Sequence, residues 1–572
     1  MKQLTKEIAK LVVASLEAAQ KAGDLPEFEI PDIKIELPKR EGQGDYAYPA
    51  MALSRFGKKN PRAIAEDIVK HLPETDFMAQ VEVAGPGFIN FFVNEGYLKA
   101  QVDAIVAEGE DVFKMDIGDG KRAQVEFVSA NPTGPIHVGR TRGGVIGDTM
   151  ARLLEAAGYD VQREYYFNNA GRQMQMLGES LKVRYLQVLG DDIDLEEDHY
   201  QGEYLVEYGQ ELAGLHGDSW REKPWRDFKE FAETKMFVWI KQSLGAINIE
   251  HDNFFNEDSM FQSEEVWETL HDLKENGYIY EAVHRKQASE EEIEKSKATE
   301  PAQWFESTKL GDKEDRVMVK ADGIPTYTLP DIAYHRNKIQ RGFDVMVNVL
   351  GADHGQQYKT VGWGVEALGL DPSGIHVILN QMVRMVVTDE ETGKKREQKG
   401  STRKGIYETL DDLVEMTSPD AIRYHLLAYS PTTDITFDVD EVVKQSNENP
   451  VYYIQNAHVR CCGIFREADE RGFTDEGADL SLLGDDELAF IRKALELGDA
   501  IEYAVDTYEP HKIAFYAHEL ASVFHPIYDR VRVLHSDVPE DVAKARLRFY
   551  AAARIMFKRV LTLMGMSAPE RM

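Results

Sequence analysis

The sequence has few cysteines, comparatively few basic residues and no long apolar run. Only Cys461 and Cys462 occur among the 572 residues, and they are adjacent. This excludes a disulfide framework and a cysteine-rich zinc site, and it fits a reducing compartment. No apolar stretch approaches the roughly 18 residues that span a bilayer. The N-terminal stretch MKQLTKEIAKLVV lacks a small-residue cleavage site, so it is interpreted as a first helix. We therefore expect a cytoplasmic protein without a membrane-spanning segment.

Acidic residues outnumber basic ones, since the chain has 100 Asp and Glu but only 66 Lys and Arg, which gives a net charge of −34. This argues at first against a nucleic-acid partner. Charge is distributed by face, however, and an acidic protein can carry a basic groove. The bulk charge therefore excludes no partner. A chain of this length is too long for one core and predicts several domains.

The order of the expected elements divides the chain into four segments. Residues 1–115 are expected to form a small α+β domain, with a pair of short strands around Gly85-Pro86-Gly87. Residues 116–400 predict an α/β domain with a doubly wound, Rossmann-like parallel sheet, because AQVEFVSA, GGVIGDTMARLLEAAGY and DVQREYYF alternate strand, helix and strand.

A mostly helical insertion is expected over about 172–305, and strands return in RVMVKADG and FDVMVNVLGADHG. Residues 401–450 are expected to form a connection in which strand signals fade. Residues 451–572 carry apolar residues at helical spacing and predict an all-α bundle. The adjacent cysteines and His458 fall in this bundle, where we interpret them as helix packing rather than as a zinc site.

The stretch SANPTGPIHVGRTRGG, residues 129–144, connects the first of these strands to its helix. Two interpretations are open from the residues alone. The stretch is an ordinary strand-to-helix turn with a capping histidine, or it leaves a helix N-terminus bare for an anion. The second interpretation fits a phosphate, because unpaired N–H groups and glycines let a nucleotide approach the backbone.

Several motifs resemble those of one enzyme family. SANPTGPIHVGR resembles the signature of class I aminoacyl-tRNA synthetases, and VEFVSANPTGPIHVG with GDTMARLLEAAGYDVQREYYFNNAGRQ is similar to arginyl-tRNA synthetases in particular. GDYAYPAMAL, VEVAGPGFINF, DGIPTYTLPDIAYH, NVLGADHG, SNENPVYYIQNAHVR, EPHKIAFYAHELASVFHPIYDRVRVL and the terminal APERM extend the resemblance in the same order over nearly the whole chain.

The resemblance implies a ligase that activates arginine with ATP and transfers it to the 3′-terminal adenosine of arginine tRNA. No general base is needed, because the substrate carboxylate is itself the nucleophile, so catalysis is positioning and charge stabilisation. The resemblance implies these ATP-binding residues: Pro132, Thr133, Gly134, His137, Gly139, Arg140, Asp353, His354, Lys399 and Ser401. His137, Arg140, Lys399 and Arg403 are the implied catalytic residues. Mg²⁺ is expected to ride on the phosphates, and no structural metal is expected.

Arginine as substrate demands carboxylates, because the guanidinium is planar and always charged. The resemblance places these residues around it: Glu126, Ser129, Asn131, His137, Tyr327 and Asp331. We expect Asp331 and Glu126 to hold the guanidinium and Tyr327 to pack on its stem. The alternative for Asp331 is that it merely N-caps the helix IAYHRN.

Two positions depart from the family pattern. Arg140 stands where a second histidine is usual, and an arginine still donates to phosphate, although with a different reach. Lys399-Gly400-Ser401-Thr402-Arg403 aligns with the second signature loop but lacks its second lysine. A basic cluster surrounds it, formed by Lys394, Lys395, Arg396 and Lys404. The alternative is a solvated basic loop.

For tRNA, basic residues interleaved with aromatic ones in the last helices suit backbone contacts and stacking on unpaired bases. The candidates are Tyr528, Arg530, Arg532, Arg546, Arg554 and Lys558, half of which would equally suit the polar face of a bundle. We expect the protein to act as a monomer with arginine, ATP and tRNA as its partners. The departures leave two alternatives, a paralogue that makes arginyl-adenylate or arginyl-tRNA for another purpose, and an inactive tRNA-binding protein.

Overall fold

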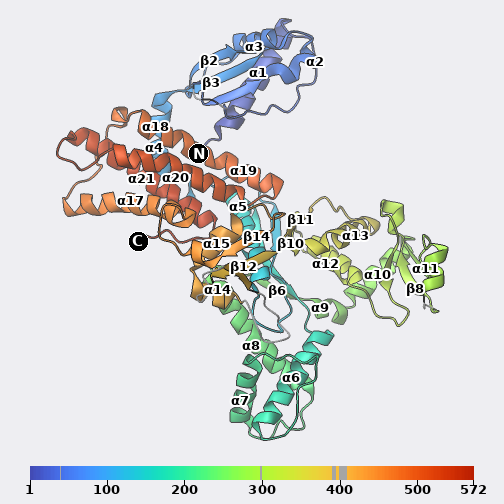
Figure 1. Ribbon diagram of the computed structural model, residues 1–572. Coiled ribbons are helices and arrows are strands. Elements are labelled where there is room, and N and C mark those ends of the chain that lie inside the picture. Colours follow the sequence, from blue (N-terminus) through green and yellow to red (C-terminus); the bar gives the residue numbers. More distant parts are fainter. Residues whose placement is uncertain (39, 41, 297–298, 389–394, 399–408) are drawn as a thin grey trace.

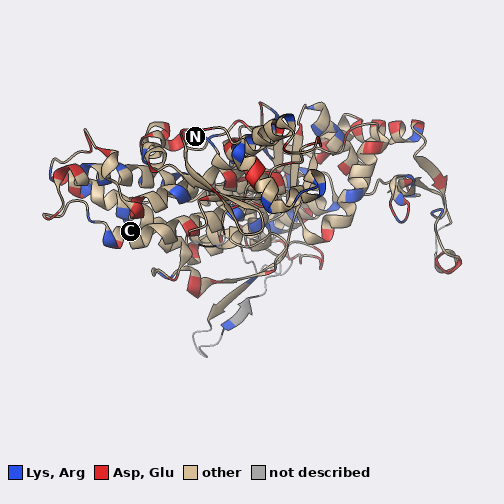
Figure 2. Ribbon diagram, turned by 90° about the horizontal axis from the view of Figure 1, so that it is seen from above, with Lys and Arg blue, Asp and Glu red and all other residues tan. Residues whose placement is uncertain are grey.

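The computed structural model describes residues 1–572 except 39, 41, 297–298, 389–394 and 399–408. A small N-terminal domain, a central parallel sheet, two modules inserted into that sheet and a C-terminal bundle make up the molecule (Figure 1). Acidic and basic residues are interspersed along the helices (Figure 2), as expected for a solvated surface. None of the described helices combines the length and apolar composition that crossing a membrane requires.

The N-terminal domain is built on an antiparallel sheet in the order β1-β3-β2. Its strands are β1 (Tyr46–Pro49), β2 (Met78–Ala84) and β3 (Phe88–Val93). The helices are α1 (Leu4–Ala22), α2 (Ser54–Gly57) and α3 (Pro61–Lys70). The β2–β3 turn requires Gly87, since its φ is 127° and a Cβ there would lie 2.8 Å from Pro61. The expected strand pair around this turn is therefore confirmed.

The central sheet has five parallel strands in the order β11-β10-β4-β5-β6. They are β4 (Arg122–Glu126), β5 (Asp160–Phe167), β6 (Asn253–Asn256), β10 (Val345–Gly351) and β11 (Ile375–Asn380). The chain leaves β4 toward β5 and β6 on one side and adds β10 and β11 on the other. The strand order therefore reverses between β4 and β10, where ligands bind in open α/β sheets.

Helices cover both faces of this sheet, as the alternation along β5 shows. Tyr165 packs in the core that contains Val145 of α5 (Val138–Ala156). Tyr166 points to the opposite face and contacts the ring of Tyr334 in α12 (Thr328–Gln340), with centroids 4.5 Å apart. A further helix, α13 (Gly355–Ala367), follows β10. The predicted doubly wound α/β class is confirmed.

The segment expected as one helical insertion consists of two parts, because β6, a strand of the main sheet, lies within that segment. Before β6 comes a helical module, made of α6 (Arg172–Val188), α7 (Tyr204–His216) and α8 (Trp225–Ala246). After β6 come α9 (Glu257–Gln262), α10 (Glu265–Glu275) and α11 (Glu290–Lys295), with an antiparallel sheet of β7 (Ile279–Ala282), β8 (Ala302–Phe305) and β9 (Arg316–Val319). The expected strand RVMV is therefore present as β9, but it belongs to this small antiparallel sheet and not to the main parallel sheet.

A third small sheet follows β11, in the order β13-β12-β14. Its strands are β12 (Val383–Thr388), β13 (Lys395–Gln398) and β14 (Ile435–Asp438). The expected loss of strands after about 405 overlooked β14, whose four residues are too short for a clear alternation. The helices around it are α14 (Leu410–Met416), α15 (Pro419–Leu427) and α16 (Val439–Val442).

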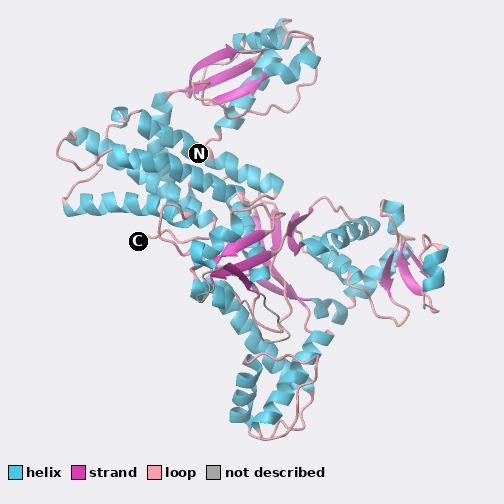
Figure 3. Cartoon of the chain, viewed as in Figure 1, coloured by secondary structure: helices cyan, strands magenta, loops and turns pink. Residues whose placement is uncertain are grey.

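The C-terminal bundle is helical throughout its described elements, as expected (Figure 3). It comprises α17 (Pro450–Glu470), α18 (Asp485–Leu495), α19 (Leu497–Thr507), α20 (Lys512–Arg530) and α21 (Glu540–Leu563). Cys461 and Cys462 are buried free thiols on α17, so they pack the bundle. From the N-terminal domain, α4 (Glu95–Glu108) runs beside α18 and α21.

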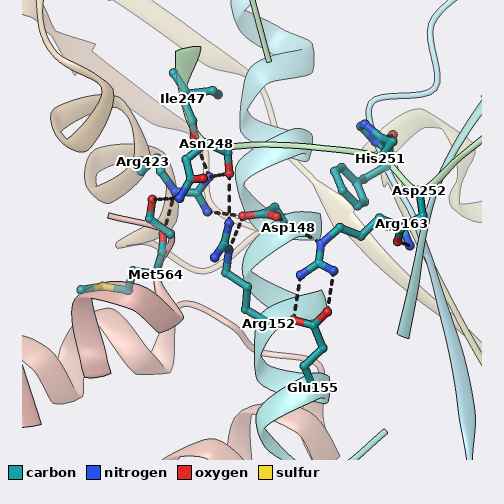
Figure 4. A network of polar contacts seen from close by, with 12 residues as sticks. Asp148, Arg152, Glu155, Arg163, Ile247, Asn248, His251, Asp252, Arg423 and Met564 are labelled. Atoms are coloured by element: carbon teal, nitrogen blue, oxygen red, sulfur yellow. Dashed lines mark hydrogen bonds and ion pairs between the residues drawn. The ribbon is translucent and has the colours of Figure 1, made fainter. Parts of the chain in front are cut away.

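A buried arginine joins the bundle to the catalytic half of the chain (Figure 4). Arg423 of α15 donates to the carbonyls of Met564 at 2.7 Å and Ile247 at 2.8 Å, and to the carboxylate of Asp148 on α5. Although burial favours the neutral acid, Arg423 and Arg152 hold the pKa of Asp148 below its usual value. The network therefore ties α5 to the end of α21.

Candidate functional site

The first loop leaves β4 at the point where the strand order reverses. Val128 and Ser129 both take left-handed backbone conformations, with φ of 67° and 43°. This conformation is costly for a β-branched residue such as valine. It turns the chain sharply, so that the Ser129 hydroxyl donates to Glu126 at 3.1 Å and accepts the Tyr166 N–H at 3.2 Å. The strained turn thus fixes Glu126 at the carboxyl end of its strand.

His137 is the N-cap of α5, and its Nδ1 accepts the backbone N–H of Gly139 at 3.3 Å. Partial burial lowers the pKa of His137, so its imidazole is neutral near pH 7. Since Nδ1 accepts, the proton of the neutral ring resides on Nε2. The capping interpretation and the anion interpretation are therefore compatible, because capping uses Nδ1 and leaves the Nε2–H group as a donor.

Arg140 lies on the first turn of α5 and is exposed. Within the described chain its one side-chain hydrogen bond runs from Nη1 to the carbonyl of Val128, at a long 3.4 Å. No described carboxylate pairs with it. The guanidinium therefore adds an uncompensated positive charge beside His137.

Two carboxylates without basic partners lie near the same edge of the sheet. Asp331, in the first turn of α12, accepts a hydrogen bond from Gln357 and pairs with no described Lys or Arg. Burial and the charges of Glu257 and Glu126 raise the pKa of Asp331 to about 7. Glu257 accepts from Tyr166 and Asn168, each at 2.6 Å, and burial raises its pKa.

Glu126, by contrast, already has a cation. Lys338 of α12 donates to it at 2.7 Å and to the amide oxygen of Asn348 at 2.6 Å, and this lysine is fully buried. A buried carboxylate paired in this way is neutralised. The geometry therefore favours Asp331 and Glu257 over the predicted pair of Asp331 and Glu126 as the group that attracts a cation.

The remaining residues predicted for arginine take different positions. Tyr327 is 83% exposed at the start of α12, so it packs on nothing in the described structure. The Asn131 amide donates to Gln173 at 2.8 Å, and its oxygen accepts the Asn168 N–H at 2.9 Å. Helix α12 begins at Thr328 with Tyr327 as N-cap, so the alternative of Asp331 as a cap is wrong.

The described residues among those predicted for ATP lie along two loops at the carboxyl edge. Pro132 is buried, and the carbonyl of Thr133 accepts a hydrogen bond from Tyr204. The Tyr204 hydroxyl also lies 3.9 Å from where a Cβ on Gly134 would be. Asp353 is exposed beside His354 in the turn between β10 and α13.

The second predicted loop lies outside the described residues, which include none of Lys399, Ser401, Arg403, Lys394 and Lys404. Its continuation is described. Thr409 pairs with His137 in an antiparallel bridge, and Leu410 N–H donates to the carbonyl of Ile136 at 2.8 Å. The first described residues after position 408, Thr409 and Leu410, therefore lie directly against the first loop. Lys395, on the other flank, pairs with Asp438.

The residues predicted to bind tRNA are engaged within the protein. Arg530 pairs with Asp486, Arg546 with the buried Glu487, and Lys558 with Glu110. Arg554 covers the ring of Phe465, Arg460 covers that of Tyr528, and Arg532 lies 3.3 Å from His535. Most of these pairs are at least partly exposed, so the contacts that a nucleic acid would have to replace are weak.

Sequence reasoning missed Glu257 and Gln357. Glu257 directly follows the short strand β6, and the signal was there in NFFN followed by two acidic residues. Gln357 follows the predicted Asp353 and His354 by one helical turn. Among the described residues, Glu196, Asp198 and His199 also form one group with ligand spacing, but Asp198 is paired with Arg172 and Nδ1 of His199 accepts the Glu196 N–H.

Comparison with known families agrees with this arrangement. Residues 4–93 match the arginyl tRNA synthetase N terminal domain, residues 101–426 the catalytic domain of class I (R) tRNA synthetases, and residues 454–572 the DALR anticodon binding domain.

Full-length relatives are also found. The arginine–tRNA ligase of Heliobacterium modesticaldum is 39% identical over 100% of this chain and 99% of its own, and that of Geobacillus thermodenitrificans is 40% identical over 97% of each. An arginyl-tRNA synthetase structure described as putative, from Campylobacter jejuni, aligns with a TM-score of 0.73 at 30% identity, over 84% of this chain and 100% of that one. The Thermus thermophilus arginyl-tRNA synthetase shares the fold, with a TM-score of 0.75 at 20% identity over 100% of both chains.

Proposed function

Because this chain belongs to the arginyl-tRNA synthetase family, we propose that it is an arginine–tRNA ligase. In the first step the arginine carboxylate attacks the α-phosphate of ATP, giving arginyl-adenylate and pyrophosphate. In the second step a terminal hydroxyl of the tRNA adenosine displaces AMP. The observation that carries the proposal is the pair Asp331 and Glu257, two carboxylates that pair with no described Lys or Arg and whose pKa values are raised by burial.

This carboxylate pair supports arginine as the substrate. A guanidinium placed between them donates to both carboxylates and offsets one of their charges, and the bidentate geometry of a carboxylate suits it better than it suits an ammonium. Gln357 orients Asp331, while Tyr166 and Asn168 orient Glu257. Glu126, Ser129, Asn131 and Tyr327 are proposed to line the remainder of the substrate, with Glu126 kept neutralised by Lys338.

His137 and Arg140 are proposed to act on ATP. The Nε2–H group of the neutral His137 donates to an α-phosphoryl oxygen as charge develops there, and the N-terminus of α5 adds its positive dipole end. Arg140 supplies a cationic donor beside the neutral His137, at the position where a histidine is usual in the family. Pro132, Thr133, Gly134, Gly139, Asp353 and His354 are proposed to shape the nucleotide pocket.

Lys399, Ser401 and Arg403 are proposed to contact the leaving pyrophosphate. The bridge between Thr409 and His137 supports this, because the segment that contains them ends beside the first loop. Mg²⁺ is proposed to enter with ATP as part of the substrate, since magnesium in nucleotide sites takes most ligands from phosphates and water.

The helical bundle is proposed to bind the tRNA through the residues predicted above. The protein is proposed to act as a monomer in the cytoplasm. In this proposal phosphates replace the carboxylates that now pair with Arg530 and Lys558. Such exchange at half-exposed ion pairs loses little, because each pair contributes about 1 kcal/mol or less.

The test is arginine-dependent exchange of labelled pyrophosphate into ATP, measured with and without tRNA, together with charging of arginine tRNA. We expect arginine, but not lysine, to support exchange. An inactive tRNA-binding protein would give no exchange under either condition. A paralogue that makes only arginyl-adenylate would support exchange and fail to charge tRNA.

A further inference from the structure

The helical module of α6, α7 and α8 extends from the carboxyl edge of the main sheet (Figure 1). It has a core of its own, built from residues such as Leu181, Tyr185 and Phe228. Nothing in the proposed chemistry assigns this module a role. Two of its aromatic side chains, however, reach the segments that form the candidate site.

Tyr204, at the first residue of α7, makes the first of these contacts. Its hydroxyl donates to the carbonyl of Thr133 at 2.7 Å, and its ring is 93% buried, with only 7% exposed. Thr133 lies in the first loop, four residues before the cap of α5. The module therefore holds the backbone of the first loop at its midpoint.

Trp239, on α8, makes the second contact. Its indole Nε1–H donates to the carboxylate of Asp411 at 2.5 Å. Asp411 belongs to the first turn of α14, two residues after Thr409, which pairs with His137. The module therefore also holds the start of α14, which lies against the end of the first loop.

The two aromatic side chains contact each other. The rings of Tyr204 and Trp239 pack edge to face, with centroids 5.9 Å apart and an interplanar angle of 67°. A continuous chain of contacts therefore runs from Thr133 through both rings to Asp411. A rigid pair of rings transmits position better than long flexible side chains, because two χ angles fix each of them.

We propose that Tyr204 and Trp239 are positioning residues for adenylate formation, which set the distance between the first loop and the start of α14. This inference rests on the proposed function. Neither side chain touches the reacting atoms. Tyr204 acts through the backbone of the first loop and Trp239 through a carboxylate on the first turn of α14, and both segments must be held within a fraction of an ångström for in-line attack.

The experiment uses Tyr204→Phe and Trp239→Phe in the full-length chain, since each keeps an aromatic ring and removes one donor. Each should lower the kcat of arginine-dependent pyrophosphate exchange about 10-fold and leave the KM for arginine unchanged. The double variant should also lose about 10-fold, not 100-fold, because one broken end already releases the bridge.

Tyr185→Phe is the matched control. Its buried hydroxyl donates to the Gly217 carbonyl at 2.6 Å inside the same module and reaches neither segment. This variant should lose a comparable amount of thermal stability and keep full exchange activity. Provided that the wild type is active, three results would overturn the inference. They are exchange rates of Tyr204→Phe and Trp239→Phe equal to that of the wild type, losses that multiply in the double variant, and a Tyr185→Phe variant as slow as the other two. Wild type without any exchange would instead overturn the proposed function.

Discussion

Burial and the charge of Glu257 raise the pKa of Asp331, and neither carboxylate has a basic partner among the described residues. The two carboxylates come from helices next to different strands of the main sheet, since α9 follows β6 and α12 precedes β10. Partly buried like charges destabilise the empty site, and a bound cation relieves them. The site is therefore prepared for a positively charged side chain before any substrate arrives.

Arginine binding should be coupled to the release of a proton. In the free protein the pKa of Asp331 is about 7, and a guanidinium beside it lowers that value. Affinity for arginine should therefore be constant above about pH 8 and fall as pH drops through 7, approaching 10-fold per pH unit. Calorimetry at pH 6.5 in two buffers of different ionisation enthalpy measures the proton directly. Equal heats in both buffers would contradict the coupling.

Replacing Asp331 by asparagine should stabilise the empty protein while it removes arginine binding. The folded-state pKa lies above the unfolded value of 3.8, so folding loses stability as pH rises from about 4 to about 7, and the loss is complete above that pH. Asp331→Asn should therefore raise the free energy of unfolding at pH 8, by at most about 4 kcal/mol, and leave it unchanged near pH 3. Denaturation midpoints at both pH values test this, and a loss of stability at pH 8 would refute it.

The role of Glu257 is tested by Glu257→Gln, with the neighbouring Asp258→Asn as control. Removing one of two carboxylates that face a buried guanidinium should weaken arginine binding by roughly 2–5 kcal/mol. The KM for ATP should stay the same, because the nucleotide is proposed to bind through His137 and Arg140 instead. Asp258 bonds only Gln262 through its side chain in the described structure, so its variant should behave as wild type. Equal arginine KM values for both variants would remove Glu257 from the site.

How far the sequence predicts this site depends on whether its residues are contiguous. The first loop is one linear motif, so the cap at His137, the glycine after it and the following helix are all predictable from residues 129–144. Glu257 and Gln357 are not, because only the strand order brings α9 and α13 beside α12. The signal for Glu257 depends on β6, whose four residues are too few for a visible period of two.

The sequence also does not show which charged residues form ion pairs with each other. Asp331 and Glu126 look equivalent as carboxylates at strand ends, yet Lys338 neutralises only Glu126. Lys338 lies seven residues after Asp331 on the same helix, a spacing of two turns that a sequence shows. Which carboxylate it reaches depends on the packing of α12 on β4, which a sequence does not show. The basic residues of α21 illustrate the same limit, since their partners Glu110 and Glu487 are far away in the chain.

Breaking the Arg423 network should destabilise the molecule strongly. Arg423→Met removes four hydrogen bonds and leaves Asp148 buried with Arg152 and Arg163 as its remaining cations. We expect a loss of about 3–5 kcal/mol, as for other buried pairs that lose one partner. Chemical denaturation followed by circular dichroism measures it.

Two variants provide the comparison for this loss. Adding Asp148→Asn to Arg423→Met should cost less than the sum of the two single losses, because both changes break the same ion pair. Arg62→Met, which breaks the exposed pair with Glu66, should cost less than about 1 kcal/mol. A loss as small for Arg423→Met as for Arg62→Met would show that the network contributes little.

The last prediction concerns the departure from the family pattern at Arg140. His137→Ala and Arg140→Ala should each slow adenylate formation on the order of 10²-fold, as expected for one lost preorganised donor. Arg140→His should retain activity, because a histidine at this position is the usual choice of the family. The rates are compared by pyrophosphate exchange at saturating arginine, with Arg471→Ala, an exposed arginine paired within α17, as control.

The structure distinguishes the roles of the two side chains. The Nδ1 of His137 is used by the Gly139 N–H, so His137→Asn keeps a cap but loses the Nε2–H donor. That variant should be as slow as His137→Ala and more stable. Arg140 holds only the long bond to Val128, so it is free to turn toward phosphate without losing a partner. An Arg140→Ala enzyme with unaltered exchange, alongside a slow His137→Ala, would mean that the guanidinium stays in solvent and that His137 acts alone.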